Sequence, residues 1–156
     1  MSGQSLLDIR HQNTAIVHAT CVAVEGRGAL VVGTSGSGKS ALALQMMAHG
    51  AVLVADDRVS LTMVDGTVIA DAVPTLRGVI EARGVGLLRA NAAGATPVCY
   101  VVDLDQTEPA RLPDPVTTVV LRQTVPLLRT GGIPNLSATL MQLLKMGRLD
   151  PQWPST

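Results

Sequence analysis

The stretch Gly33-Thr-Ser-Gly-Ser-Gly38-Lys39-Ser40 agrees at every fixed position with the phosphate-binding loop (Walker A) pattern G-x-x-x-x-G-K-[ST]. Its glycines let the backbone turn tightly, so that successive N–H groups point toward phosphate oxygens, and the following helix adds the positive end of its dipole. In this pattern the lysine reaches the β- and γ-phosphates and the last hydroxyl binds Mg²⁺. The predicted phosphate-binding residues are therefore Gly33, Thr34, Ser35, Gly36, Ser37, Gly38, Lys39 and Ser40.

The residues on either side of the loop have the order that a phosphate site needs. The apolar run 29–32 predicts a strand before the loop, and the strong helix formers at 41–48 predict a helix after it, with Gly50 as its C-cap. The alternative is a glycine-rich turn in front of an ordinary helix. The strand–loop–helix context favours the phosphate site.

The composition is that of a single compact globular domain. The chain has 156 residues, 47% hydrophobic and 15% charged, with a formal net charge of zero. It is long enough to bury a core. Zero net charge gives no general attraction to nucleic acid or to an anionic membrane. Only Tyr100 and Trp153 are aromatic, so the chain has too few aromatic side chains for a surface that stacks against nucleic-acid bases.

The chain shows no targeting or membrane signal. Its first twelve residues include Asp8, Arg10 and His11 and lack an apolar centre, and no apolar run is long enough to span a bilayer. Cys21 and Cys99 lack metal-ligand spacing and are expected to be small buried hydrophobic residues. The expected compartment is the cytoplasm.

The hydrophobic pattern predicts an α/β fold with a mixed central sheet flanked by helices. Residues 14–24 predict a strand that pairs, through the turn 25–28, with the strand feeding the loop. A further apolar strand, 51–54, follows the helix 39–49. This strand–helix–strand unit predicts parallel pairs in the sheet.

The rest of the chain predicts further strands and one closing helix. The Asp65-Gly66 turn predicts a hairpin, 72–86 is irregular, and 109–115 is a proline-rich loop. We expect a flexible N-terminus at 1–13, one domain at 14–147 and a C-terminal tail at 148–156. The remaining predicted elements are the hairpin strands 59–64 and 67–70, the strands 97–103 and 117–121, and the helix 136–146 ended by Gly147.

Two carboxylates, Asp56 and Asp57, stand at the end of the strand that follows the loop helix, only sixteen residues beyond Ser40. A carboxylate at this place is where Mg²⁺ ligation is expected beside a phosphate loop. One carboxylate could hold the metal while the other accepts a proton from an attacking hydroxyl. The alternative is a solvated turn at a strand end.

Three further residues carry less specific signals. His18 stands alone on an apolar strand, where a histidine is more often part of the core than a catalyst. Glu81 lies in an apolar segment and needs a partner, either Mg²⁺ or Arg83 in a structural pair. Arg111 lies in the proline-rich loop and is solvated or contacts phosphate.

Together these motifs resemble the catalytic domain of the HPr kinase/phosphorylase family, bacterial enzymes that phosphorylate a serine of the phosphocarrier protein HPr. The resemblance covers residues 14–147. It rests on His18 fifteen residues before the loop, Gly50–Asp57 matching G-x-x-L-V-A-D-D, Glu81–Leu88 matching E-x-R-G-x-G-[IL]-[IL], and, more weakly, Asn135-Leu136 with Lys145-Met146-Gly147.

The resemblance implies an HPr kinase/PEP carboxykinase-like fold and an ATP- and Mg²⁺-dependent protein serine kinase that also catalyses reverse phosphorolysis of phospho-HPr. Asp56 would be the catalytic base, His18 would orient it, and Lys39 would neutralise the transferring phosphoryl group. Ser40, Asp57 and Glu81 would hold Mg²⁺. Pyrophosphate is implied as an alternative donor.

The chain also departs from the family pattern, because it lacks the N-terminal domain and has a shortened C-terminal region. The resemblance implies a homo-oligomer with HPr as its substrate and no nucleic acid or membrane partner, and the shortening argues against a hexamer. Two alternatives stay open. A small-molecule P-loop kinase would usually carry an arginine-rich lid, which is not visible here. An ATP-sensing regulatory module would not need Asp56, Asp57, Glu81 and His18.

Overall fold

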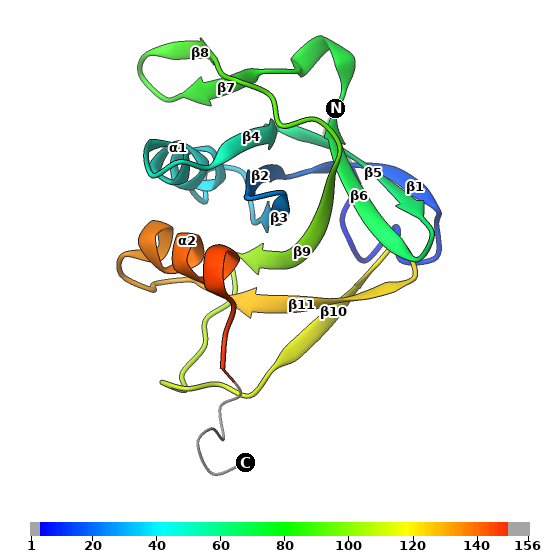
Figure 1. Ribbon diagram of the computed structural model, residues 1–156, viewed down its shortest axis with the longest axis vertical. Helices are drawn as coiled ribbons and strands as arrows, with labels where there is room; N and C mark the ends of the chain where they lie inside the picture. Colours follow the sequence, from blue (N-terminus) through cyan, green and yellow to red (C-terminus); the bar gives the residue numbers. More distant parts are fainter. Residues whose placement is uncertain (1–3, 150–156) are drawn as a thin grey trace.

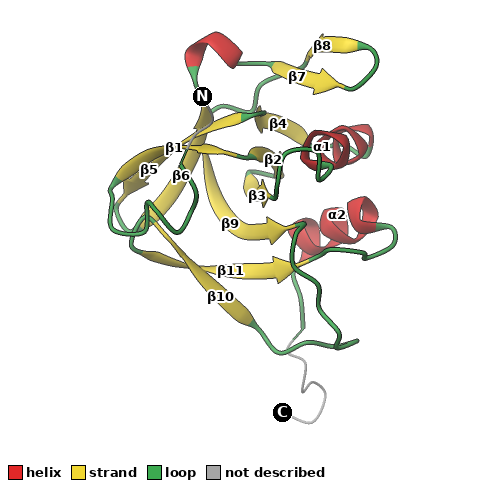
Figure 2. Ribbon diagram, turned by 180° about the vertical axis from the view of Figure 1, so that it is seen from behind, coloured by secondary structure: helices red, strands yellow, loops and turns green. Residues whose placement is uncertain are grey.

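Strands dominate residues 4–149, the part of the chain that this computed structural model describes (Figure 1). Two α-helices and one short 3₁₀ turn accompany them (Figure 2). The elements are β1 (Thr14–His18), β2 (Thr20–Val24), β3 (Arg27–Val32), α1 (Lys39–Ala48), β4 (Val52–Ala55), β5 (Arg58–Val64), β6 (Thr67–Ala72), η1 (Pro74–Leu76), β7 (Val79–Ala82), β8 (Gly86–Arg89), β9 (Thr96–Asp103), β10 (Val116–Val120), β11 (Gln123–Arg129) and α2 (Leu136–Met146).

The main sheet is mixed, as predicted. Its order is β1-β5-β6-β9-β3-β2-β4, and β11 pairs with β9 and carries β10. Strand β9 is parallel to both β3 and β11, whereas the other pairs are antiparallel. The strands on either side of α1, β3 and β4, do not pair with each other, because β2 lies between them and is antiparallel to both. The parallel pairs that the sequence predicts therefore come from β9.

Both α-helices lie side by side on one face of the sheet (Figures 1 and 2). Leu42 and Met46 of α1 and Leu140 and Leu144 of α2 pack there against the buried side chains of β2 and β3. The opposite face is covered by curled strands instead, since its cluster draws on β1, β5, β6 and the β10–β11 hairpin. This packing fixes the start of α1, and with it the phosphate loop, against the end of β3.

The structure differs from the sequence prediction in three strand regions. The single strand predicted at 14–24 is broken at Ala19, so that β1 pairs with β5 and β2 with β3. The stretch 72–86, predicted to be irregular, contains η1, strand β7 and the first residue of β8, and β7 and β8 form a separate hairpin. Strand β11 was not predicted, because its tight turn uses Leu121 and Arg122 at positive φ in place of the usual Asn-Gly signal.

The described part of the N-terminal segment is packed against the domain. Ile9 is fully buried, and the backbone N–H of Arg122 donates a hydrogen bond to the carbonyl oxygen of Arg10. Most of the predicted C-terminal tail, 150–156, lies outside the described residues. Between residues 4 and 149, neither α-helix combines the length and the apolar character needed to cross a membrane.

The two cysteines differ in burial, and a thiol-labelling experiment should separate them. Cys21 is buried, and burial, with a smaller contribution from the nearby Cys99, raises the pKa of its thiol. A raised thiol pKa keeps Cys21 protonated and unreactive at neutral pH. We expect Cys99, which is half-buried, to react first with a maleimide in the folded protein. Faster labelling of Cys99→Ser than of Cys21→Ser would contradict this.

Candidate active site

The phosphate loop connects β3 to α1 in a compact turn. The backbone N–H of Ser37 donates to the carbonyl oxygen of Thr34 at 3.0 Å. A Cβ atom at Gly33 would lie 2.5 Å from Ser37 Oγ, and Gly38, the residue that begins the helix, has a φ of 102°. Both positions therefore require glycine, the first for close approach and the second for its backbone conformation.

Lys39 is held over this loop by two carbonyl groups. Its Nζ atom donates to the carbonyl oxygens of Gly33 at 2.9 Å and Thr34 at 3.0 Å, and the residue is only 7% exposed. An ammonium group has three N–H donors. Two fix the side chain to the loop, and the third is the one suited to a phosphate oxygen.

The loop is braced by a carboxylate that the sequence analysis missed. Asp105 accepts hydrogen bonds from the backbone N–H of Thr34 at 2.7 Å and from the Thr34 hydroxyl at 3.2 Å. It follows β9, which runs parallel to β3, so both strands deliver their C-terminal ends to this edge. The only available signal was an acidic residue just after a predicted strand.

Asp56 is buried and fully engaged by hydrogen bonds. Its Oδ1 atom accepts from the hydroxyls of Thr20 and Ser40, each at 2.8 Å, and its Oδ2 atom accepts from the backbone N–H of Glu81 at 3.0 Å. The residue is 4% exposed. Thr20 was also missed, because a threonine in a strand gives no functional signal. Asp56 therefore ties β2, the loop helix and β7 together.

Asp57, by contrast, points outward from a strained turn. Asp57 has a φ of 66°. The backbone N–H of Arg58 donates a hydrogen bond of 2.7 Å to the carbonyl oxygen of Asp56, so Asp57 is the central residue of a γ-turn. Its side chain is 64% exposed, and its Oδ1 atom lies 3.2 Å from Nε2 of His18. Strain of this kind clusters at functional sites. The pair presents a reachable carboxylate at the end of β4.

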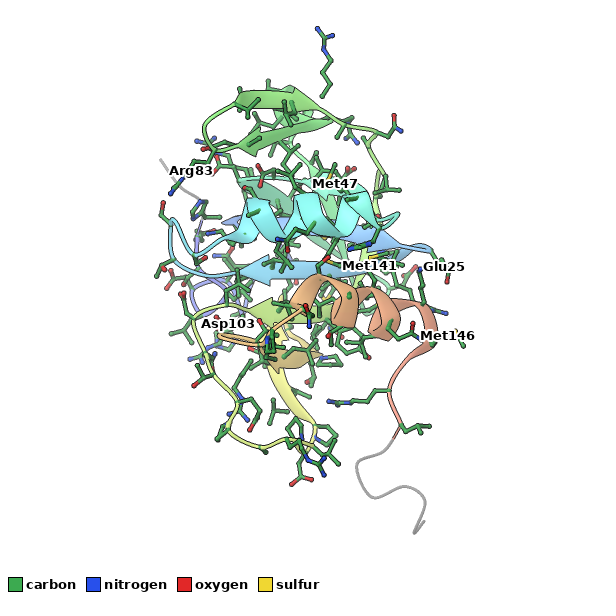
Figure 3. All side chains as sticks on the ribbon, turned by 90° about the vertical axis from the view of Figure 1, so that its left-hand side faces the viewer. Glu25, Met47, Arg83, Asp103, Met141 and Met146 are labelled. Carbon is green, nitrogen blue, oxygen red and sulfur yellow. The ribbon has the colours of Figure 1, made fainter. Side chains whose placement is uncertain are left out.

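The side chains of Lys39, Asp56 and Asp57, with those of His18 and Ser40, line one cavity of about 450 Å³. The predicted loop residues Gly33, Thr34 and Ser37, and the bracing Asp105, lie outside its lining. The β7–β8 hairpin closes it from the side, bringing Glu81, Ala82 and Arg83, and Figure 3 shows Arg83 at the end of the molecule where α1 begins. Arg111 lies in an exposed loop outside this lining. The full lining is His18, Thr20, Ser35, Gly36, Gly38, Lys39, Ser40, Ala41, Leu44, Asp56, Asp57, Glu81, Ala82 and Arg83.

The oxygen atoms in this cavity suit Mg²⁺ better than a transition metal. Ser40, Asp56, Asp57 and Glu81 offer hydroxyl and carboxylate oxygens, the ligands that Mg²⁺ prefers. Within residues 4–149 there is no group of three or more His, Cys, Asp or Glu side chains placed to hold an ion on its own.

A glycine-rich loop between a strand and a helix, next to an acidic strand end, is the arrangement of an α/β phosphate-binding domain. Residues 10–99 match the family model described as the HPr Serine kinase C-terminal domain. The chain belongs to this family.

Curated relatives carry the name HPr kinase/phosphorylase. The protein from Mycoplasma mycoides is 38% identical over 84 residues, which cover 54% of this chain and 27% of that protein. The one from Aromatoleum aromaticum is 35% identical over 137 residues, which cover 80% of this chain and 41% of that protein. The chain thus spans between about a quarter and two fifths of the length of these relatives.

A solved structure supports the fold. The Hpr(Ser) kinase/phosphatase from Coxiella burnetii matches with a TM-score of 0.72 over 83% of this chain and 88% of that one, at 23% sequence identity. The curled mixed sheet with two helices is therefore the fold of this neighbour.

Proposed function

We propose that this chain transfers the γ-phosphoryl group of ATP, in the presence of Mg²⁺, to a serine hydroxyl of HPr, and that it runs the reaction in reverse with phosphate. The observation that carries the proposal is the convergence of His18, Lys39, Ser40, Asp56 and Asp57 on one cavity. Family membership supplies the acceptor, because the relatives are named for HPr.

The hydrogen bonds favour a different division of labour between the aspartates from the one that the resemblance implies. Both oxygens of Asp56 are occupied and one binds Ser40, the predicted metal ligand, so Asp56 is better suited to the metal side. Asp57 is exposed and supported by His18, so it is better placed to accept the proton of an incoming serine. We therefore propose Asp57 as the base.

Each remaining residue then has a defined task. Mg²⁺, when bound by Ser40 and the neighbouring carboxylates, would neutralise charge on the phosphate oxygens. Lys39 would hold the transferring phosphoryl group, and the loop N–H groups would hold the β-phosphate. Glu81 and Arg83 line the same cavity, and we assign Glu81 to the metal site, as the resemblance implies. In the reverse direction Asp57 would return its proton to the serine oxygen.

Measuring ADP release separates this function from its alternatives. The chain is incubated with MgATP alone, with HPr, and with HPr whose acceptor serine is replaced by alanine. Release that requires the serine supports the proposal. Release stimulated by a small-molecule extract but not by HPr would favour a small-molecule kinase. ATP binding without release in any mixture would favour a regulatory module.

Replacing His18 by glutamine tests whether it positions Asp57. We expect kcat to fall by about 10- to 100-fold, because misplacing a reacting group by about 1 Å costs about that much. The sharper readout is a double-mutant cycle: in the Asp57→Asn background, His18→Gln should have almost no further effect on kcat. Additive losses would mean that His18 acts independently of Asp57.

A further inference from the structure

One peptide group of the phosphate loop, the one that joins Gly33 to Thr34, is bound at its two ends by side chains of opposite charge. Its N–H, on Thr34, donates to Oδ2 of Asp105 at 2.7 Å. Its carbonyl oxygen, on Gly33, accepts from Nζ of Lys39 at 2.9 Å. A peptide group is a dipole whose positive end is the N–H and whose negative end is the oxygen. The carboxylate and the ammonium group therefore each meet the end of opposite sign.

This arrangement favours one orientation of the peptide group over the reverse one. Turned by half a rotation, the group would present its oxygen to the carboxylate of Asp105 and its N–H to the ammonium group of Lys39, and both contacts would be repulsive. The glycine at position 33 does not restrict the choice, because glycine has no Cβ atom to limit the backbone. The two charged side chains therefore decide which orientation the loop adopts.

Asp105 is the member of this pair whose position is fixed from outside the loop. It lies in a tight turn after β9, in which its backbone N–H donates to Oδ1 of Asp103 at 2.8 Å. The segment after β11 packs against this turn: the N–H of Gly131 donates to the carbonyl oxygen of Gln106 at 2.7 Å, and a Cβ atom at Gly131 would lie 2.9 Å from that oxygen. Figure 3 shows Asp103 at the same end of the molecule as Arg83.

Lys39, by contrast, depends on the loop for its position. Its long side chain is flexible, and its ammonium group is held by the carbonyl oxygens of Gly33 and Thr34. If the peptide group turned, one of these two acceptors would be lost. Asp105 does not line the cavity that contains Lys39. It therefore acts on the lysine through the peptide group and not on a bound phosphate.

We propose that Asp105 is a positioning residue of the phosphate loop, which orients the Gly33–Thr34 peptide group so that its oxygen holds Lys39 in place. The consequence for catalysis rests on the proposed function, in which Lys39 holds the transferring phosphoryl group. The structural part of the inference needs neither ATP nor HPr, so it can be tested on the chain alone.

The test is the rate at which the lysine amines react with acetic anhydride in the folded, ligand-free chain, followed by peptide mass spectrometry. The chain has two lysines, and Lys145 is exposed on α2, so it is an internal reference for Lys39. We expect Asp105→Ala to raise the rate at Lys39 at least about fivefold relative to Lys145, because a hydrogen bond that protects the amine is lost. Asp105 is exposed, so its replacement should leave the core folded.

Two further variants assign the effect to the hydrogen bond. Asp105→Asn keeps an acceptor oxygen for the N–H of Thr34 but not the charge, so the increase at Lys39 should be smaller, about twofold. Asp114→Ala removes an exposed carboxylate from the same loop, 104–115, and should leave the ratio of the two rates unchanged. The same increase in Asp114→Ala as in Asp105→Ala would overturn the inference.

Transfer kinetics connect this position to catalysis. With HPr and MgATP, kcat/KM for ATP should fall at least about tenfold in Asp105→Ala and less in Asp105→Asn, because Lys39 is displaced from the phosphoryl group. An unchanged labelling ratio in every Asp105 variant that folds would overturn the inference and leave the proposed function intact. A raised ratio in a chain that transfers nothing to HPr would support the inference and contradict the proposed function.

Discussion

Replacing Asp57 by asparagine should lower the rate of phosphoryl transfer to HPr by about 10²- to 10⁴-fold, the usual contribution of a general base. Asparagine keeps the size of the side chain and, like aspartate, tolerates a positive φ, so the backbone turn with φ of 66° should survive. Because the side chain is exposed, the free energy of unfolding should change by less than about 0.5 kcal/mol. The variant therefore removes the base and little else.

The measurement is single-turnover transfer to HPr together with ATP affinity. ATP should bind Asp57→Asn about as tightly as the wild-type chain, so the loss falls on kcat. Asp57→Ala is the informative companion, since alanine is strained at positive φ and should lose stability as well as activity. Near-normal transfer by Asp57→Asn would exclude Asp57 as the base.

Replacing Asp56 by asparagine should give a different signature, in which stability and the Mg²⁺ requirement change together. The amide has only one acceptor oxygen, whereas Asp56 accepts from Thr20, Ser40 and Glu81 through both oxygens. Losing one hydrogen bond to a buried carboxylate costs about 1.5–3 kcal/mol of folding free energy. Activity at low Mg²⁺ should fall more steeply than activity at high Mg²⁺.

Denaturant unfolding and a Mg²⁺ titration of activity check this second prediction. The matched variant Thr20→Val separates the loss of stability from the change in Mg²⁺ requirement. Thr20→Val removes one donor to Asp56 but no carboxylate, so it should lower stability while leaving the Mg²⁺ requirement in place. If Asp56→Asn abolished transfer at every Mg²⁺ concentration and unfolded like the wild-type chain, Asp56 would be the base, as the resemblance implies.

The parts of the site that the sequence predicted are those encoded locally. The loop, α1 and the Asp56-Asp57 pair follow from patterns within about twenty-five residues, where strand, glycine turn and helix signals agree. The closing helix was likewise predicted at 136–146, the bounds that the structure gives, because its periodic pattern ends at Gly147. Local consistency of this kind is what pattern analysis detects.

The parts that it missed depend on contacts between distant residues. Thr20 meets Asp56 only because β2 lies beside β4, and Asp105 meets the loop only because β9 is parallel to β3. No short sequence pattern predicts either strand pairing. The difference in exposure between Asp56 and Asp57 is also invisible in an Asp-Asp pair, since it arises from the backbone turn and from burial.

The oligomeric state and the reverse reaction stay predictions of the resemblance. The curated relatives extend well beyond the matched region. The phosphate chemistry proposed here uses only groups that this chain contains.

The most direct test of the central claim is to map the phosphoryl group on HPr by tandem mass spectrometry after incubation with this chain, Mg²⁺ and ATP. The account predicts one added phosphoryl group on one serine, formed by the wild-type chain and strongly reduced with Asp57→Asn. HPr that stays unmodified after prolonged incubation with excess ATP would contradict the account. A phosphoryl group on a histidine in place of a serine would also contradict it.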